Sequence, residues 1–249
     1  MKVQIDTIPV HEAYETADEC PFCYLQRVTE QKAIRYTAGP CASYMEPDVR
    51  AATDRQGFCP THFKKLYDYG NSLGNALMMQ TYMIGLRKEL DQQLNDFELP
   101  DKKPLFGKRE YKELPLTRWL REKRESCFLC SKVNYNMHRY YATFFHLIKD
   151  ESFRKKVEDS KGMCLCHMEK LLESADEHLQ NGQREWFYAT LSNLQRKNFA
   201  RVQEDLDWFI EKFDYRNAGA DWKNSKDAVS RTMQKLSGIY PADPVFKEN

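Results

Sequence analysis

The stretch Cys20-Pro-Phe-Cys23 is followed by Cys59-Pro-Thr-His62, and the same order recurs as Cys127-Phe-Leu-Cys130 followed by Cys164-Leu-Cys166-His167. The ends of these four motifs account for six of the eight cysteines and two of the six histidines in the 249-residue chain. In both copies a glycine stands two residues before the first cysteine of the second motif, and a leucine stands four residues after its histidine. This agreement beyond the cysteines and histidines predicts an internal duplication.

Each motif separates two metal-binding residue types by two positions. At a turn or in a first helical turn, this gap places both donor atoms on one side of the chain, and two such halves complete a tetrahedron. Pro21 and Pro60 directly follow their cysteines, where a proline is tolerated as the first residue of a helix. The positive end of the helix dipole favours thiolate at such positions. We therefore expect each metal ion to hold two helix starts together.

We predict one Cys3His site in each copy of the repeat. The first predicted site is Cys20, Cys23, Cys59 and His62, and the second is Cys127, Cys130, Cys164 and His167. Two zinc ions are favoured over an iron–sulfur cluster because such clusters mostly take four thiolates, although the cluster stays an open alternative. Four protein ligands leave no position for a catalytic water, so we expect the ions to be structural.

The remaining sequence predicts an all-α protein made of two related helical modules. Glycine and proline number only ten each, apolar residues recur at spacings of three and four, and no strand pattern is evident. The predicted modules span residues 1–96 and 117–213, with a linker at 97–116 and a C-terminal loop, helix and tail at 214–249. Helices are predicted at 21–36, 47–54, 60–69, 73–95, 117–124, 128–148, 152–158, 164–178, 183–213 and 225–236.

Charge and apolar patterning favour a cytoplasmic protein without a membrane partner. The formal net charge of +1, from 38 basic and 37 acidic side chains, provides no long-range attraction for nucleic acid or an anionic membrane. Residues 1–19 lack the basic region and apolar stretch of an export signal. The longest apolar run, at 140–148, is too short to span a bilayer. In the cytoplasm, paired cysteines more often bind metal or act in redox chemistry than form structural disulfides.

The other cysteines and histidines have simpler interpretations. Cys41 has no motif partner and is expected to be a core or loop thiol, and Cys166 is expected to be a packed cysteine, with an exchange of roles with Cys164 left open. Histidines 11, 138, 146 and 178 are expected to be ordinary core or surface residues. Cys20-Pro-Phe-Cys23 also matches the thioredoxin type of redox motif, but that fold needs flanking strands.

One segment near the C-terminus mixes aromatic, basic and amide side chains in a predicted loop. Such groups bind bases by stacking and phosphates by charge. The candidate binding residues are Tyr215, Arg216, Asn217, Trp222 and Lys223. Because no catalytic triad order, phosphate loop or nucleotide fingerprint is present, we expect a non-enzymatic binding or adaptor protein whose partner is an unknown protein or small ligand. A thiol redox enzyme, a zinc or Fe–S enzyme, and a nucleic-acid-binding protein are the alternatives.

With its Cys/His motifs, the chain resembles a bacterial family catalogued as domain-of-unknown-function family 6062. Four further stretches carry the resemblance: Tyr36-Thr37-Ala38-Gly39-Pro40, Tyr44-Met45-Glu46-Pro47-Asp48-Val49-Arg50, Phe213-Asp214-Tyr215-Arg216-Asn217 and Asn224-Ser225-Lys226-Asp227-Ala228. The likeness runs from about residue 5 to residue 240. It implies a soluble bacterial protein and transfers no activity.

Overall fold

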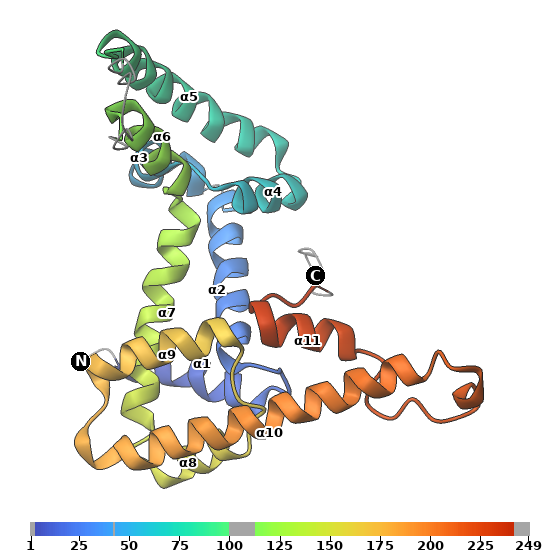
Figure 1. Ribbon diagram of the computed structural model, residues 1–249. Helices are drawn as coiled ribbons and strands as arrows, with labels where there is room; N and C mark the ends of the chain where they lie inside the picture. The colour runs from blue at the N-terminus through green and yellow to red at the C-terminus, as the bar shows by residue number, and fades with distance from the viewer. Residues whose placement is uncertain (1–2, 42, 100–112, 242–249) are drawn as a thin grey trace, which may run out of the picture. The chain divides into compact units, whose positions relative to one another are not determined.

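The computed structural model describes residues 3–41, 43–99 and 113–241, and within them the regular structure is entirely helical (Figure 1). The predicted all-α class is therefore confirmed. The α-helices are α1 (Val3–Glu15), α2 (Pro21–Ala38), α3 (Pro47–Gln56), α4 (Pro60–Tyr69), α5 (Ser72–Asn95), α6 (Pro115–Glu125), α7 (Phe128–Leu147), α8 (Glu151–Glu158), α9 (Leu165–His178), α10 (Arg184–Glu211) and α11 (Ala228–Ser237). Three short 3₁₀ helices join them: η1 (Ser43–Met45), η2 (Asn181–Gln183) and η3 (Tyr215–Asn217).

Helix α1 is the element that the sequence analysis did not predict. It contains Pro9, which removes a backbone donor and is unfavourable inside a helix. Its buried positions are Asp6, Val10, Ala13 and Tyr14, which follow helical spacing. The ring of Tyr14 packs edge-on against Phe153 of α8, with centroids 5.1 Å apart. Tertiary packing of this face therefore stabilises a helix that the local sequence only weakly favours.

The contacts group the described residues into two compact units. Unit 1 takes in residues 3–29 and 135–241, and unit 2 takes in those between 30 and 134. Each unit thus draws on segments from both predicted modules, and α2 and α7 each contribute residues to both units. The predicted modules follow the order of the motifs along the chain, whereas the units are made from segments distant in the chain.

Each unit has its own apolar core. In unit 1, α10 packs along α11, α11 contacts α9, and α1 contacts α8 (Figure 1). Its largest fully buried side chains include Phe22, Phe144, Phe145 and Phe153. In unit 2, α3 and α4 pack on α5, and the buried cluster is Ile34, Ala38, Val49, Phe58, Leu66, Met78, Cys127, Phe128 and Leu129. Cys127 is thus part of a core, so any ion it binds is joined to packed structure.

Two further predictions concern the linker and membrane spans. Residues 100–112 of the predicted linker and 242–249 of the predicted tail lie outside the described residues. Within the described part of the chain, none of the helices combines the length and apolar character needed to cross a membrane.

Candidate metal centres

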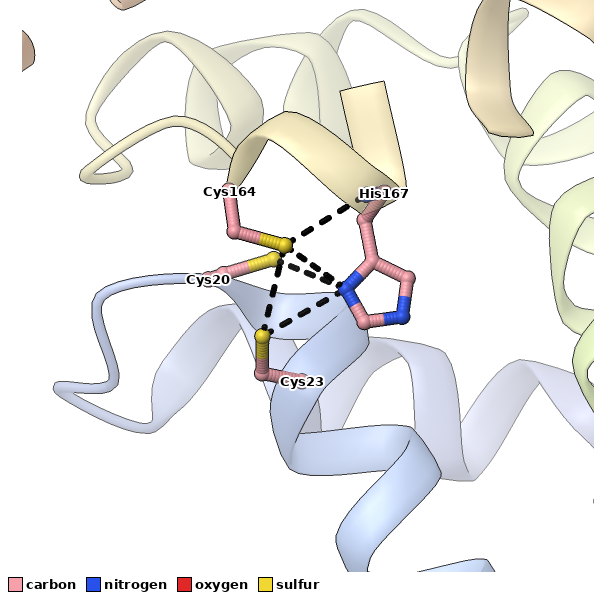
Figure 2. Close-up of side chains that lie close together, drawn as sticks. All are labelled: Cys20, Cys23, Cys164 and His167. Atoms are coloured by element: carbon pink, nitrogen blue, oxygen red, sulfur yellow. Dashed lines mark hydrogen bonds between the residues drawn. The ribbon is translucent and has the colours of Figure 1, made fainter. Parts of the chain in front are cut away.

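All eight predicted ligands lie in two clusters, but the clusters combine the motifs differently from the prediction. The first cluster is Cys20, Cys23, Cys164 and His167 (Figure 2), and the second cluster is Cys59, His62, Cys127 and Cys130. Within each cluster the candidate ligand atoms all lie within 4.8 Å of one another. The prediction that each copy closes its own site is therefore wrong, since each cluster takes its CxxC motif from one copy and its CxxH motif from the other.

The lengths of α2 and α7 explain why each CxxC motif joins a CxxH motif other than the one that follows it in the sequence. Helix α2 has 18 residues and α7 has 20, so each is about 27–30 Å long at 1.5 Å per residue. Each helix passes from one unit to the other, so a CxxC motif and the CxxH motif that follows it fall in different units. The Nε2 of His62 lies 3.1 Å from Oε1 of Glu30, which is about two turns beyond Cys23 on α2. The next segment, α3, packs on α5 within unit 2, where Cys59 lies in the cluster with Cys127 and Cys130.

The first cluster joins the start of α2 to the start of α9. Cys164 is the N-cap of α9, and its Sγ accepts a hydrogen bond from the backbone N–H of His167 at 3.4 Å. The Nδ1 of His167 lies 3.1 Å from Sγ of Cys164, 3.4 Å from that of Cys23 and 3.6 Å from that of Cys20 (Figure 2). All four side chains are at least 95% buried. One ion at their centre would have no solvent-facing side.

The second cluster joins the start of α4 to the start of α7 in the same way. Cys59 is the N-cap of α4, and the backbone N–H of Cys130 donates to Sγ of Cys127 at 3.4 Å. The Nδ1 of His62 lies 3.3 Å from the sulfur of each of its three cysteines. His62 and Cys127 are buried, whereas Cys59 and Cys130 are half-buried. Each cluster thus lies where two helices begin, and an ion that holds them together stays a prediction.

The separations match the edges of a tetrahedron around a single ion. Sγ of Cys23 lies 3.6 Å from that of Cys164, and Sγ of Cys59 lies 3.7 Å from that of Cys130. A disulfide would need about 2.05 Å, and all eight cysteines are free. Metal–sulfur bonds of about 2.3 Å give sulfur–sulfur edges of about 3.8 Å, and the edge to a histidine nitrogen is about 3.6 Å. The two clusters could therefore each hold a metal ion.

The outer nitrogen of each imidazole has its own hydrogen-bond partner. Nε2 of His167 lies 2.8 Å from Oε1 of Gln26, and Nε2 of His62 faces the carboxylate of Glu30, which also pairs with Lys65. Metal-bound histidines typically donate their other ring N–H to such oxygens, which fixes the ring orientation and the tautomer. Both rings are thus held with Nδ1 towards the sulfurs.

Proton sharing in the second cluster favours one thiolate. Burial opposes ionisation of Cys127, but hydrogen bonds from His62 and from the backbone N–H of Cys130 outweigh it and lower the pKa of Cys127 to about 6. Burial also disfavours a charged His62, yet its hydrogen bonds with Cys127 and Glu30 raise the pKa of His62 to about 10. Burial and the neighbouring Cys127 raise the pKa of Cys130. The metal-free cluster therefore pairs the Cys127 thiolate with the His62 imidazolium. A metal ion that binds there would displace the imidazolium proton.

The first cluster shows the same division among its thiols. Burial opposes ionisation of Cys20, but hydrogen bonds with Cys164, Cys23 and His167 hold its pKa well below the usual range. The hydrogen bond with Cys20 raises the pKa of Cys164 to about 12. Hydrogen bonds with Cys164 and Cys20, followed by burial, raise the pKa of Cys23. A divalent ion would remove the protons that these thiols share.

Helix α11 fastens the two segments that supply the first cluster. The ammonium of Lys235 is buried and donates to the backbone oxygen of Glu19 at 2.6 Å and to that of Lys161 at 2.5 Å. Glu19 immediately precedes Cys20, and Lys161 lies three residues before Cys164. At the end of α11, a Cβ on Gly238 would lie 3.4 Å from Sγ of Cys164. This helix therefore covers the first cluster and positions its ligands.

The remaining two cysteines lie outside both clusters. Cys41 is exposed, as a loop thiol would be. Cys166 is also exposed, and its Sγ donates to the backbone oxygen of Ser237 at 3.4 Å. The expectation of a packed Cys166 is wrong because its position, two residues after Cys164 on α9, faces away from the core.

Several side chains of the predicted binding segment have structural partners. Arg216 is paired with Asp214 at 2.6 Å, and Nδ2 of Asn217 donates to the backbone oxygen of Glu211. Trp222 packs against Phe209 and Phe213, and the ammonium of Lys223 lies 4.2 Å from the ring centre of Trp208. Tyr215 is 86% exposed. The five residues lie on one connection between α10 and α11, and their binding role stays a prediction.

Two groups of chemically capable residues were not predicted. His138, Glu177 and His178 bring candidate ligand atoms within 4.8 Å of one another. A polar cavity in unit 1 also gathers basic residues from four segments. Neither group as a whole has a sequence signal, because each combines segments that are distant in the chain, although Lys223 of the cavity belongs to the predicted binding segment.

The comparisons with known proteins bear on family membership. Neither the search of curated proteins nor the search of solved structures found a match. The model for a family of unknown function, DUF6062, matches residues 1–243. The resemblance carried by the Cys/His motifs is therefore confirmed over nearly the whole chain, and the protein belongs to the DUF6062 family.

Proposed function

We propose that the protein is a non-enzymatic helical binding or adaptor protein, acting in the cytoplasm, whose two clusters each hold a structural zinc ion. The observation that carries the proposal is the closed donor set of each cluster, three sulfurs and one imidazole nitrogen at tetrahedral spacing. A catalytic zinc keeps a position for water or substrate, whereas a structural zinc is surrounded by four protein ligands. The burial of the first cluster further supports a structural role.

The spacing favours a single ion over an iron–sulfur cluster. In a cluster, several iron and sulfide atoms separate the cysteine ligands, so their sulfurs lie farther apart than around one ion. Here the sulfur–sulfur separations are 3.6 and 3.7 Å. A mixed set of thiolates and imidazole also suits zinc, whereas most iron–sulfur clusters take four thiolates.

Zinc would stabilise the fold by joining segments that are far apart in the chain. Cys23 and Cys164 are 141 residues apart, and Cys59 and Cys130 are 71 residues apart. A link that closes long loops restricts the unfolded chain more than one that closes a short loop. Because the metal binds the folded arrangement, its binding free energy contributes to folding.

The test is metal analysis of protein purified without added metal, combined with thermal unfolding. We expect two zinc ions per chain, no visible absorbance, and a melting temperature that falls when a chelator removes the zinc. Brown protein that contains iron and sulfide would show that the sites hold an iron–sulfur cluster and not zinc. Metal-free protein with an unchanged melting temperature after zinc addition would reject the proposal.

A thiol redox enzyme is the second candidate, supported by a different observation. Cys59 and Cys130 are half-buried with sulfurs 3.7 Å apart, and the pKa of neighbouring Cys127 is lowered to about 6 by its hydrogen bonds despite burial. If this function is correct, the metal-free protein will reduce a small disulfide substrate, with a dithiol regenerating its thiols. The zinc scaffold predicts no such turnover, and Cys130→Ser separates true catalysis from background exchange.

A further inference from the structure

A cavity of about 510 Å³ lies within unit 1, and every residue that lines it has a polar or charged side chain. It is formed by residues 159–161 before α9, by α10, by residues 223–227 before α11, and by Arg231 of α11. Ligand pockets are typically about 300–1,000 Å³, so this volume suits a small molecule. No apolar or aromatic side chain lines the cavity, which argues against an apolar ligand or a stacked base.

The charges of the lining select for an anion. Six lining residues are cationic, namely Lys161, Lys197, Arg201, Lys223, Lys226 and Arg231, whereas two, Asp159 and Asp227, are acidic. A concave surface lined mainly by one sign of charge concentrates ions of the opposite sign. The near-neutral net charge of the whole chain conceals this local excess.

The two arginines are already engaged with carboxylates. Arg231 pairs with Asp205 and Asp227 at 2.8 Å, and Arg201 pairs with the buried carboxylate of Glu19 at 2.5 Å. Glu19 also lies 3.7 Å from Lys161 and 3.5 Å from Lys235. This network fixes the floor of the cavity, because each guanidinium is held by groups on neighbouring segments. The guanidinium groups of Arg201 and Arg231 therefore serve mainly to shape the cavity.

Three lysines remain without an acidic partner among the residues that the structure describes. Lys197 projects from α10, and Lys223 and Lys226 come from the loop before α11. Lys223 has φ +50° in a left-handed conformation, and its ammonium lies over the ring of Trp208. The cation–π contact holds this charge in place while leaving it able to bind an anion. Lys197 and Lys226 are exposed and add two further ammonium groups.

We propose that this cavity binds a small, multiply charged phosphate compound, such as a polyphosphate or a phosphorylated polar metabolite. Lysine ammonium groups act as point charges that suit phosphate oxygens, and the arginine forks that could bind a carboxylate or a phosphate bidentately are here occupied. Several unpaired lysines favour a ligand with more than one negative charge. The inference goes beyond the proposed function because it needs no metal in either cluster.

The test is calorimetric titration of the full chain, as purified, with pyrophosphate and separately with inorganic phosphate. We expect one site per chain, tighter binding of pyrophosphate than of phosphate, and weakening with added salt. The double variant Lys197→Gln/Lys226→Gln removes two charge-assisted contacts and should bind pyrophosphate at least about tenfold more weakly. The matched control is Lys149→Gln/Lys155→Gln, whose lysines lie in the same unit outside the cavity, and it should bind like the unsubstituted protein.

The outcomes separate the cavity from other sources of anion binding. Melting temperature and helical circular dichroism establish that each variant is folded, so lost binding is assigned to the removed charges. No heat of binding at millimolar pyrophosphate, or equal affinity in both double variants, overturns the proposal. If a single-stranded oligonucleotide binds and pyrophosphate does not displace it, the basic surface serves nucleic acid and the small-anion site is rejected. Zinc content, measured on the same samples, tests the proposed function separately.

Discussion

At the scale of single residues, the two histidines differ in the group that holds Nε2. His167 faces the neutral amide of Gln26, whereas His62 faces the carboxylate of Glu30. A carboxylate makes a bound imidazole a stronger electron donor than an amide does. The two clusters thus have the same ligand types, but the group that contacts Nε2 of the histidine is neutral in the first cluster and negatively charged in the second.

These partners allow a matched pair of variants. Loss of such a supporting group typically lowers metal affinity by about 10–100-fold. We expect Glu30→Ala to weaken zinc binding in the second cluster and Gln26→Ala to weaken it in the first, as measured by competition with a chromogenic chelator. Glu30→Gln should retain part of the affinity, because an amide oxygen can still accept the hydrogen bond. If either single variant weakened zinc binding equally at both clusters, the assignment of Glu30 to the second cluster and Gln26 to the first would be wrong.

The thiolate of Cys127 leads to a pH prediction for the metal-free protein. Burial opposes ionisation, but hydrogen bonds from His62 and the backbone lower the pKa of Cys127 to about 6, from an ordinary value of about 8.5. A lowered pKa stabilises the fold above the unfolded value, and this contribution is lost as the pH falls through 6. Ultraviolet thiolate absorbance should therefore show a step near pH 6.

Two variants locate that step. Cys127→Ser should abolish it, and Cys41→Ser, at an exposed cysteine outside the clusters, should leave it unchanged. Zinc should also remove the step, because bound thiolate no longer takes up a proton in that range. Persistence of the step in Cys127→Ser would assign the low pKa to another thiol.

At the scale of elements, the turns before α4 and α9 each contain a glycine with a positive φ. Gly57 has φ +61° and Gly162 has φ +73°, and each stands two residues before the cysteine that caps its helix. A side chain at Gly57 would lie 2.5 Å from the ring of Tyr82, and one at Gly162 would lie 2.6 Å from Oε1 of Gln195. The two copies therefore require the same turn, for reasons of conformation and of space.

Alanine at these turns should destabilise both units. We expect Gly57→Ala and Gly162→Ala each to cost about 1–3 kcal/mol from the positive φ alone, which lowers the melting temperature by about 2–12 °C in a chain of this size. The control is Gly85→Ala in α5, where an added Cβ meets nothing within 4 Å. Alanine is the better helix former, so this variant should stabilise by up to about 1 kcal/mol. If Gly57→Ala and Gly162→Ala leave the melting temperature unchanged, an alanine is not strained at these two turns.

Helix α11 gives a second prediction at this scale. Burial lowers the pKa of Lys235, and its ammonium donates to the backbone oxygens beside both halves of the first cluster. Lys235→Met keeps the volume but leaves these buried oxygens without their donor, at a cost of about 1–3 kcal/mol each. We expect a lower melting temperature and faster zinc release from the first cluster only, followed with a chelator. Lys155→Met, on an exposed lysine of α8, is the control.

At the scale of the whole molecule, the exchange of half-sites can be tested by counting ions. Cys20→Ser/Cys164→Ser removes two ligands of one cluster, so we expect this variant to retain one zinc ion. Cys20→Ser/Cys59→Ser damages both clusters and should retain none. Closure of a site within each copy would give the reverse result, so elemental analysis of the two variants distinguishes the arrangements.

Sequence alone was sufficient for the helical class, for ten of the eleven helices in the described residues, and for the identity of the eight candidate ligands. These features depend on local patterns, namely three-and-four apolar spacing, proline after a capping cysteine, and two-residue gaps between donors. The same patterns failed at α1, because the face that buries Val10 and Ala13 is stabilised by the rest of unit 1 and not by its own residues.

Tertiary structure decided which half-sites meet and which basic residues surround a cavity. A CxxC motif supplies two of the four ligands of a tetrahedral site, so a second motif must supply the other two. In the sequence, either of the two CxxH motifs could do so equally well. The choice follows from the packing within each unit, because α2 and α7 both pass from one unit to the other, so each CxxC motif and the CxxH motif that follows it fall in different units. Likewise, Lys197 and Lys226 acquire a shared role only because α10 and the loop before α11 are packed together.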